Sequence, residues 1–398
     1  MSELSIPGIR LGIAQAGIKY ENRDDLTIIE IAEGSSTAAV FTQNAFRAAP
    51  VLVAERNNAA VDARYILINS GNANAGTGER GMMACEQSCE ALATATHTDS
   101  GRVLPFSTGL IGEVLAVEKL EAALPAAISD LSAANWHRAS RAIMTTDTVP
   151  KLRRKVVTLE DGRTCHLVGM SKGSGMIQPN MATMLGFIAT DASISREMLD
   201  GMLRAAVNVS FNRITVDGDT STNDAVTLTA TGQSDFSILP TDRGAALAFQ
   251  DALSELATEL AQDIIRDGEG ATKFVDITVS NAKSEAEADQ VARTVAHSPL
   301  VKTALFASDP NWGRILAAVG RAGVIGLNVD VVSLSLNGVL IAEKGARAVS
   351  YTEEAGVAAM APKDLVISID LGRGEKSATL WTTYFSYDYV KINAEYRT

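Results

Sequence analysis

The hydrophobic and polar residues of this 398-residue chain follow two alternating patterns. Short apolar or alternating runs are typical of strands, and longer stretches with apolar residues every three to four positions are typical of amphipathic helices. The predicted strands cover residues 27–31, 38–41, 65–69, 155–159, 164–168, 184–190, 225–231, 274–280, 329–336, 339–341, 365–371 and 378–385. The predicted helices cover residues 82–96, 117–134, 198–207 (with Ser195 just before it), 242–266 and 283–297.

Two predicted turns and one apolar helix face add detail to this pattern. The sequence E-D-G-R at 160–163 and the Asn337-Gly338 pair carry the signal of tight hairpins between strands. In the helix predicted over 242–266, leucines 253, 256 and 260 and Ile264 share one face, which is simplest as core packing. Helices and strands alternate without a regular strand–helix–strand repeat, so the pattern predicts a layered α+β fold.

Composition narrows the classes of function. The length predicts two or three compact units. The 35 Lys and Arg against 47 Asp and Glu give a net charge of −12, which argues against nucleic acid as a partner. Cys85, Cys89 and Cys165 lack zinc-site spacing and are expected to be reduced, so we expect a cytoplasmic protein with no metal. We expect neither a secretory signal nor a membrane span.

The segment S-K-G-S-G-M-I-Q-P-N-M-A-T-M-L (171–185) offers candidate chemistry. Cleavage between Ala182 and Thr183 would place a hydroxyl nucleophile beside a free α-amine. That amine has a pKa of roughly 7.7 to 8, against about 10.4 for lysine, so it is the better base at neutral pH. Spacing alone does not require this chemistry, because a loop entering a strand explains the same residues.

Other candidates also have ordinary explanations. Thr108 and Gly109 follow V-L-P-F and could supply oxyanion donors, although spacing alone favours a helix N-cap at Ser107 or Thr108. Lys172 would ordinarily be a solvated loop lysine, and Glu269 an exposed residue of a glycine-rich turn. The D-G-D-T-S-T-N-D segment (217–224) lacks the glycine and glutamate that a calcium loop needs.

Eight motifs in register resemble the ornithine acetyltransferase family, also called the bifunctional arginine-biosynthesis ArgJ family. The resemblance extends from about residue 8 to the C-terminus. Besides the segment around Thr183, the motifs are S-G-N-A-N-A (70–75), S-T-G-L-I-G (107–112), M-T-T-D-T-V-P-K (144–151), T-V-D-G-D-T-S-T-N-D (215–224), D-G-E-G-A-T-K (267–273), D-P-N-W-G-R (309–314) and the C-terminal D-Y-V-K-I-N-A-E-Y-R-T.

The resemblance implies an αββα-type sandwich with a second, smaller α/β lobe. It also implies self-cleavage at Ala182-Thr183 into an alpha chain (1–182) and a beta chain (183–398), assembled as a heterotetramer of two of each. Thr183 would be the nucleophile, and Thr108 and Gly109 would form the oxyanion hole. The implied substrate-binding residues are Thr148, Lys172, Thr183, Glu269, Asn393 and Thr398.

The activity implied by the resemblance is transfer of the acetyl group of N2-acetyl-L-ornithine to L-glutamate through an acetyl-threonine intermediate. Its partners would be these small molecules, with no metal or organic cofactor. Some family members also use acetyl-CoA to acetylate glutamate, and the sequence leaves this open. Two alternatives stay open as well: a related self-cleaving N-terminal-nucleophile amidase or aminopeptidase, and a binding protein with an uncleaved loop. The 309–314 motif has no mechanistic role here and is interpreted as structural or interfacial.

Overall fold

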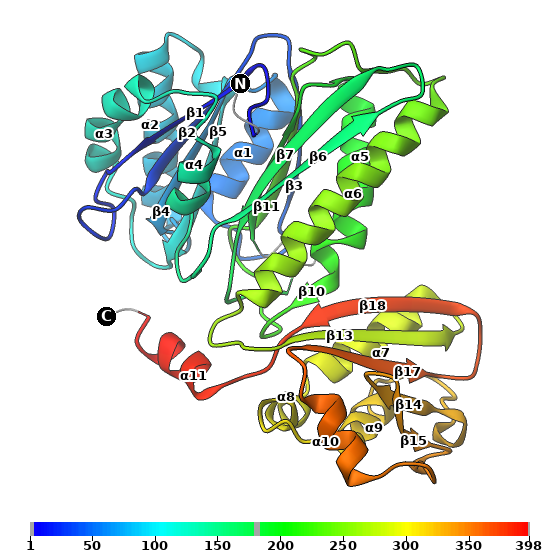
Figure 1. The fold of residues 1–398 in the computed structure, drawn as a ribbon. Coiled ribbons are helices and arrows are strands. Elements are labelled where there is room, and N and C mark those ends of the chain that lie inside the picture. The colour runs from blue at the N-terminus through cyan, green and yellow to red at the C-terminus, as the bar shows by residue number, and fades with distance from the viewer. Residues whose placement is uncertain (1–3, 179–183, 397–398) are drawn as a thin grey trace. The chain divides into compact units, whose positions relative to one another are not determined.

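The computed structural model describes residues 4–178 and 184–396, and the chain divides into two compact units (Figure 1). The first comprises Met1–Asn212 and Thr220–Ile264, and the second comprises Arg213–Asp219 and Ile265–Thr398. The prediction of two or three units is therefore confirmed. The described residues on both sides of the predicted cleavage position, up to Gln178 and from Met184, belong to the first unit.

The first unit contains two larger sheets and six helices among its described residues. One sheet has the order β1 (Ile9–Ala14), β2 (Leu26–Ile31), β4 (Tyr65–Asn72), β5 (Val103–Leu110). The other has the order β3 (Ser36–Phe41), β11 (Ala225–Ala230), β8 (Leu185–Thr190), β7 (Thr164–Lys172), β6 (Lys151–Thr158), and β9 (Ser193–Ile194) pairs with β12 (Ser237–Ile238). The helices are α1 (Ala49–Ala60), α2 (Gly78–Thr96), α3 (Val117–Ser129), α4 (Trp136–Ala142), α5 (Arg196–Val209) and α6 (Arg243–Arg266).

These elements form an αββα sandwich. The two larger sheets share a core in which the rings of Phe106 (β5) and Phe187 (β8) meet edge to face, with centroids 5.2 Å apart. Helices α2 and α3 cover the outer face of the first sheet, burying Cys89 and Leu120. Helices α5 and α6 cover the second sheet, where α6 lies so close to β7 that a side chain at Gly169 would press on its leucines. The predicted α+β sandwich is confirmed.

The second unit is built on a mixed seven-stranded sheet. Its order is β10 (Ile214–Thr215), β18 (Lys376–Thr382), β13 (Phe274–Ala282), β17 (Asp364–Asp370), β14 (Ser333–Leu336), β15 (Val339–Glu343), β16 (Ala346–Arg347). The described helices are α7 (Glu285–Ala296), α8 (Pro299–Phe306), α9 (Trp312–Gly320), α10 (Glu353–Met360) and α11 (Tyr387–Ala394).

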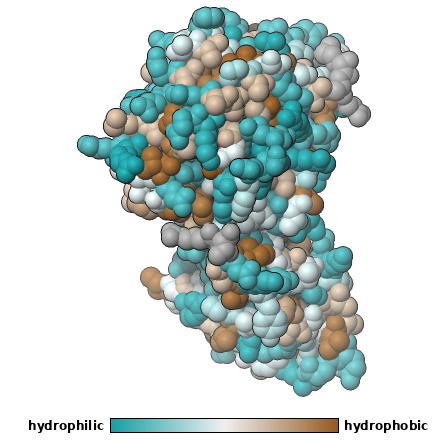
Figure 2. All heavy atoms as spheres, turned by 90° about the vertical axis from the view of Figure 1, so that its left-hand side faces the viewer, coloured by the Kyte–Doolittle hydropathy of each residue, from teal (hydrophilic) through white to brown (hydrophobic). Residues whose placement is uncertain are grey.

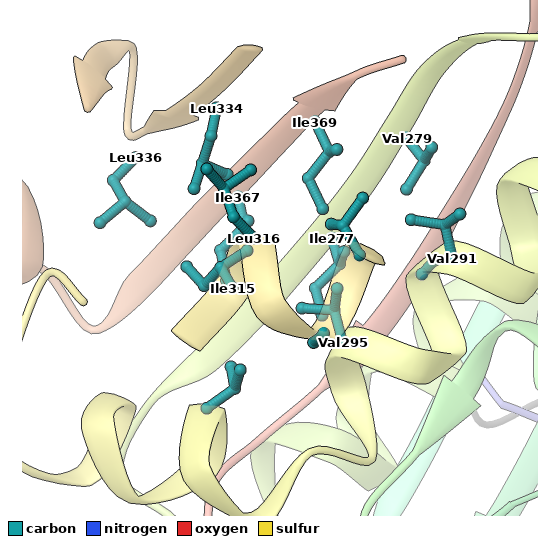
Figure 3. Packing of buried hydrophobic residues seen from close by; sticks show 14 of the residues in the cluster. Ile277, Val279, Val291, Val295, Ile315, Leu316, Leu334, Leu336, Ile367 and Ile369 are labelled. Carbon is teal, nitrogen blue, oxygen red and sulfur yellow. The ribbon is translucent and has the colours of Figure 1, made fainter. Parts of the chain in front are cut away.

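The core of this unit lies between the sheet and helices α7 and α9 (Figure 3). Ile277 from β13 and Ile367 from β17 face Val291 of α7 and Leu316 of α9. Fully burying each such aliphatic side chain contributes about 1.5–3 kcal/mol. The alternating apolar residues of the strands and the helical spacing in α7 therefore produce one continuous core.

The strongest local predictions are confirmed. The 160–163 turn joins β6 and β7, with Gly162 at a φ of +88°. Asn337 and Gly338 connect β14 and β15 with φ values of +44° and +81°, as an Asn-Gly hairpin requires. Helix α6 begins one residue after its predicted start, and its predicted apolar stripe is buried. Ser195 is the N-cap of α5 and accepts a hydrogen bond from the Met198 backbone.

Several boundaries differ from the prediction, and two of them have a clear physical reason. The helix expected over 117–134 ends at Ser129, because the Asp130 carboxylate turns to accept hydrogen bonds from the Ile13 backbone and the Asn135 amide. The strand expected from residue 329 begins at Ser333, because the Asn328 side chain caps a short 3₁₀ helix over Val329–Val331. The sequence patterns also did not predict β1, α1 or the short helices α8–α11.

The face drawn in Figure 2 is mainly hydrophilic, with hydrophobic residues scattered between the polar ones. Among the residues that the structure describes, no helix combines the length and apolar character needed to cross a membrane.

Candidate active site

Thr108 and Gly109 lie within strand β5, so the interpretation of Ser107 or Thr108 as a helix cap is wrong. Gly109 adopts a φ of +140°, and a β-carbon there would lie 2.2 Å from the carbonyl carbon of Gly71. Only glycine fits this position. The β4–β5 register shifts at Gly71 and the next residue, a bulge of the kind that re-aims groups beside active sites.

Two segments far apart in the sequence hold this strand through Ser107. The Asn223 side-chain amide donates hydrogen bonds to the carbonyl oxygens of Ser107 (2.9 Å) and Ala73 (2.6 Å). The Ser107 hydroxyl in turn donates to Asn69 Oδ1 across 2.6 Å. These groups are buried, so losing one partner would leave the others unsatisfied. The 217–224 loop thus supports the predicted oxyanion strand, a role that sequence reasoning missed.

Lys172 is the last residue of β7 and is only 9% exposed, so the solvated-loop interpretation is wrong. Its ammonium donates a hydrogen bond to Thr108 Oγ1 across 3.0 Å and another to Thr145 Oγ1 across 2.9 Å. The structure therefore brings together Lys172 and Thr108, two candidates separated by 64 positions in the sequence.

A buried carboxylate lies next to this lysine. Asp147 accepts hydrogen bonds at Oδ1 from Lys151 Nζ (2.7 Å) and the Gly173 backbone (2.6 Å). Burial alone would raise the pKa of Asp147, but Lys172, Lys151 and these hydrogen bonds outweigh it and lower the pKa to about 2. Asp147 and Lys151 both belong to the M-T-T-D-T-V-P-K motif (144–151). Sequence reasoning used that motif only for Thr148, which is exposed beside Asp147.

The chain on either side of the predicted cleavage point is fixed in the same unit. Leu185 pairs with Lys172 in the β7–β8 register, and the Met184 carbonyl accepts a hydrogen bond from Ala225 N at 3.0 Å. Upstream, the Gln178 carbonyl accepts from Thr220 Oγ1 at 3.1 Å. The predicted nucleophile Thr183 and cleavage residue Ala182 lie outside the described residues.

A second buried carboxyl belongs to Asp224, the residue just before β11, and it interacts with the backbone of Met184. Burial raises its pKa well above the ordinary value, and this outweighs hydrogen bonds from Ser221 and Met184 and the charge of Lys172. One of its carboxyl oxygens, Oδ2, is buried without a hydrogen-bond partner. Asp147 and Asp224 therefore both feel the charge of Lys172 but have opposite pKa shifts.

In the second unit, Glu269 and Asn393 also meet. Asn393 Nδ2 donates to Glu269 Oε2 across 2.7 Å, and Glu269 is 6% exposed, so the exposed-turn interpretation is wrong. Tyr389 of the same helix, α11, donates to Asp217 Oδ2 at 3.4 Å. Its pKa is raised by burial and by the nearby charges of Asp217 and Glu269. These carboxylates give the cluster a negative field that suits a cation. Thr398 lies outside the described residues.

A buried lysine anchors the segment that leads to this helix. Lys302 of α8 is 1% exposed and donates hydrogen bonds to Thr383 O (2.7 Å) and Thr382 Oγ1 (3.2 Å). Its ammonium also lies over the Phe385 ring, which stacks on Tyr389. Burial lowers the pKa of Lys302 to about 7. Lys302 therefore holds the segment that joins β18 to α11.

The remaining sequence candidates have structural roles or no ligand geometry. In the 309–314 motif, Asn311 caps α9, and Arg314 donates to Leu300 O and Thr303 Oγ1, joining α8 to α9. Cys85 and Cys89 are buried on one face of α2, and Cys165 is also buried and free. Within residues 4–178 and 184–396, no group of three His, Cys, Asp or Glu side chains is placed to hold a metal ion.

In this sandwich, β5 of one sheet presents a threonine–glycine pair and β7 of the other sheet presents a buried lysine next to the chain that enters β8. This arrangement defines a candidate acyl-transfer site. Comparison with known proteins agrees with this class. The family model described as "ArgJ family" matches residues 10–398. The arginine biosynthesis bifunctional protein ArgJ of Pseudomonas syringae pv. tomato is 55% identical over 394 residues, covering 99% of this chain and 97% of that protein. The ArgJ protein of Pseudomonas fluorescens is 54% identical over 396 residues, with 99% and 97% covered.

A solved structure agrees as well. The crystal structure of the arginine biosynthesis bifunctional protein ArgJ from Bacillus halodurans is 38% identical with a TM-score of 0.50, covering 54% of this chain and 100% of that chain. The chain belongs to the ArgJ family. The family predicted from the sequence motifs is therefore confirmed.

Proposed function

We propose that this protein transfers the acetyl group of N2-acetyl-L-ornithine to L-glutamate, producing L-ornithine and N-acetyl-L-glutamate in arginine biosynthesis. The observation that carries the proposal is the contact between Lys172 and Thr108 at the end of β7. Lys172 also pairs with Leu185, two residues beyond Thr183, and this pairing supports a nucleophile close to Thr108.

The proposed mechanism uses the Thr183 hydroxyl as nucleophile and its own α-amine as base. The hydroxyl attacks the acetyl carbonyl while the amine takes its proton, and negative charge develops on the carbonyl oxygen. Thr108 and Gly109 stabilise that oxygen. The amine then gives the proton to the departing ornithine nitrogen, leaving an acetyl ester on Thr183. The amino group of glutamate attacks the ester in the second half-reaction.

The substrate is bound through charge in this account. Glu269, held by Asn393 and close to the charge of Asp217, suits the side-chain ammonium of ornithine. Lys172, Thr148 and Thr398 complete the proposed substrate-binding set. No metal or organic cofactor takes part in the proposed reaction. Use of acetyl-CoA as an alternative donor is tested by supplying it with glutamate and measuring N-acetylglutamate.

Self-cleavage at Ala182-Thr183 is the step that makes the amine available. The coverage of the solved Bacillus halodurans structure supports the cleavage. That whole chain matches 54% of this sequence, and residues 183–398 also make up 54% of it. We expect the two pieces to assemble as a heterotetramer of two alpha and two beta chains in the cytoplasm. Native mass spectrometry of the purified protein tests this assembly.

The deciding assay supplies N2-acetylornithine with and without glutamate. A transferase releases ornithine at a rate that depends on glutamate, and N-acetylglutamate forms in equal amount. A hydrolase of the N-terminal-nucleophile class instead releases ornithine and acetate at the same rate without glutamate. That result would overturn the proposed transfer.

A further inference from the structure

Lys172 contacts the hydroxyl of Thr108, and the chemistry of the two groups fixes the direction of their hydrogen bond. An ammonium group only donates hydrogen bonds, so in the 3.0 Å contact Thr108 Oγ1 must be the acceptor. A threonine hydroxyl has one hydrogen of its own, and accepting from Lys172 leaves that hydrogen to donate elsewhere. The same argument applies to Thr145, whose Oγ1 accepts from Lys172 across 2.9 Å.

We infer that Lys172 serves catalysis by polarising the Thr108 hydroxyl, so that this hydroxyl donates its hydrogen to the negative oxygen of the transition state. A hydroxyl that accepts a bond from a cation becomes a stronger donor, because hydrogen bonds in a chain strengthen one another. The inference rests on the proposed function and assigns Lys172 a role beyond binding the substrate carboxylate.

The surroundings keep the lysine in place for this role. Asp147 lies beside it and accepts from the backbone of Gly173, the residue that follows Lys172, across 2.6 Å. Asp147 also accepts from the Thr145 backbone across 3.1 Å, so the second hydroxyl partner of Lys172 is fixed as well. Because Lys151 pairs with the same carboxylate, two cations share one buried anion. Lys172 therefore places positive charge next to the Thr108 hydroxyl, where developing negative charge is stabilised.

The test is a double-mutant cycle on the cleaved enzyme with Thr108→Ala, Lys172→Met and the double variant. Removing an oxyanion donor is expected to lower kcat by about 10²–10³-fold. Lys172→Met is expected to lower kcat by roughly 10-fold or more, in addition to any rise in KM from the lost contact with the substrate carboxylate, and to lower kcat almost no further once Thr108 is alanine. Lys172→Arg, which keeps a cationic donor, is expected to retain part of the activity.

A substrate without the carboxylate separates polarisation from binding. N-acetyl-1,4-diaminobutane is acetylornithine lacking that group, so a lysine that only binds the carboxylate would make no difference to it. Polarisation instead predicts the same loss of kcat in Lys172→Met with both substrates. Equal losses from Lys172→Met with and without Thr108, or a raised KM with unchanged kcat, would overturn the inference.

The cycle can still be read if a variant fails to cleave itself at Ala182-Thr183. Intact mass shows whether each variant is cut, and the attack on the Ala182 carbonyl also produces a negative oxygen. If the variants purify as single chains, the same cycle is read from the rate at which the two pieces form, and additive effects there contradict the inference. If the wild type transfers acetyl while the cycle is additive, only this inference fails. If the wild type does not transfer acetyl, the proposed function fails.

Discussion

Asn393 donates a hydrogen bond to the Glu269 carboxylate across 2.7 Å, although 124 positions separate the two residues. The contact joins helix α11 to the buried turn after α6, and it orients one carboxylate oxygen. Because an oriented and largely desolvated carboxylate binds a cation more strongly than an exposed one, the pair is a ready recognition element for an amino-acid side chain that carries an ammonium group.

Glu269→Gln keeps the shape and the bond to Asn393 but removes the charge. We expect KM for acetylornithine to rise by about 10–100-fold, because a hydrogen bond to a charged group contributes roughly 1.5–3 kcal/mol. Steady-state kinetics with both substrates checks this. Glu375→Gln, at an exposed position of the same unit, is the matched control and should behave as wild type. An unchanged KM in Glu269→Gln would remove this residue from the substrate site.

The two buried aspartates near Lys172 should respond oppositely to the same substitution. Asp147→Asn breaks a buried ion pair and leaves the charge of Lys151 without its partner carboxylate. We therefore expect the free energy of unfolding to fall by about 3–5 kcal/mol. Asp224→Asn removes a carboxylate whose ionisation is opposed by burial, so we expect a higher Tm at neutral pH. Thermal unfolding of both variants at pH 7 measures this, and a shift in the same direction for both would contradict the electrostatic assignment.

The Asp147 pKa also predicts an acid-sensitive window. Its pKa falls from 3.8 to about 2 on folding, so its ionised form stabilises the fold above pH 3.8, and this contribution is lost as the pH falls towards 2. The shift corresponds to about 2 kcal/mol. Denaturant unfolding of the wild type and Asp147→Asn between pH 5 and pH 2 should show the stability difference narrowing. A difference that stays constant over this range would contradict the assignment.

Replacing glycine by alanine should have opposite effects at Gly109, which has a positive φ and no room for a side chain, and at Gly201, which has open space in a helix. Gly109→Ala would place a methyl group 2.2 Å from the Gly71 backbone at a φ of +140°, so we expect misfolding of β5 and loss of activity. Gly201 lies in α5 with open space around its β-carbon position, so Gly201→Ala should stabilise the protein by about 0.5–1 kcal/mol. Activity and Tm of both variants test this, and an active, stable Gly109→Ala protein would contradict the proposed geometry.

The sequence predicted well those features that depend on local chemistry. Helix α6 has a long 3.6-residue period, and the Asn337-Gly338 turn needs the positive φ values that these residues adopt readily. The oxyanion segment was harder, because a Ser-Thr-Gly run at the end of an apolar stretch is equally typical of a helix cap. Only the parallel pairing of β5 with β4 shows that it continues as a strand.

The part of the site that sequence reasoning missed depends on contacts between distant segments. Asp147 and Lys151 form an ordinary-looking pair of charges in the sequence, and their importance arises from burial against Lys172 and Gly173. Asn223 acts on β5 from more than a hundred residues away. No periodicity or spacing rule detects such partners, although their presence in motifs quoted for the family was a usable signal.

The most direct test of the central claim is intact-mass spectrometry of the purified protein after brief exposure to acetylornithine without glutamate. The account predicts two pieces, residues 1–182 and 183–398, with the second heavier by one acetyl group that disappears when glutamate is added. An active protein that stays a single uncut chain, or a beta piece that never carries the acetyl group, would contradict it.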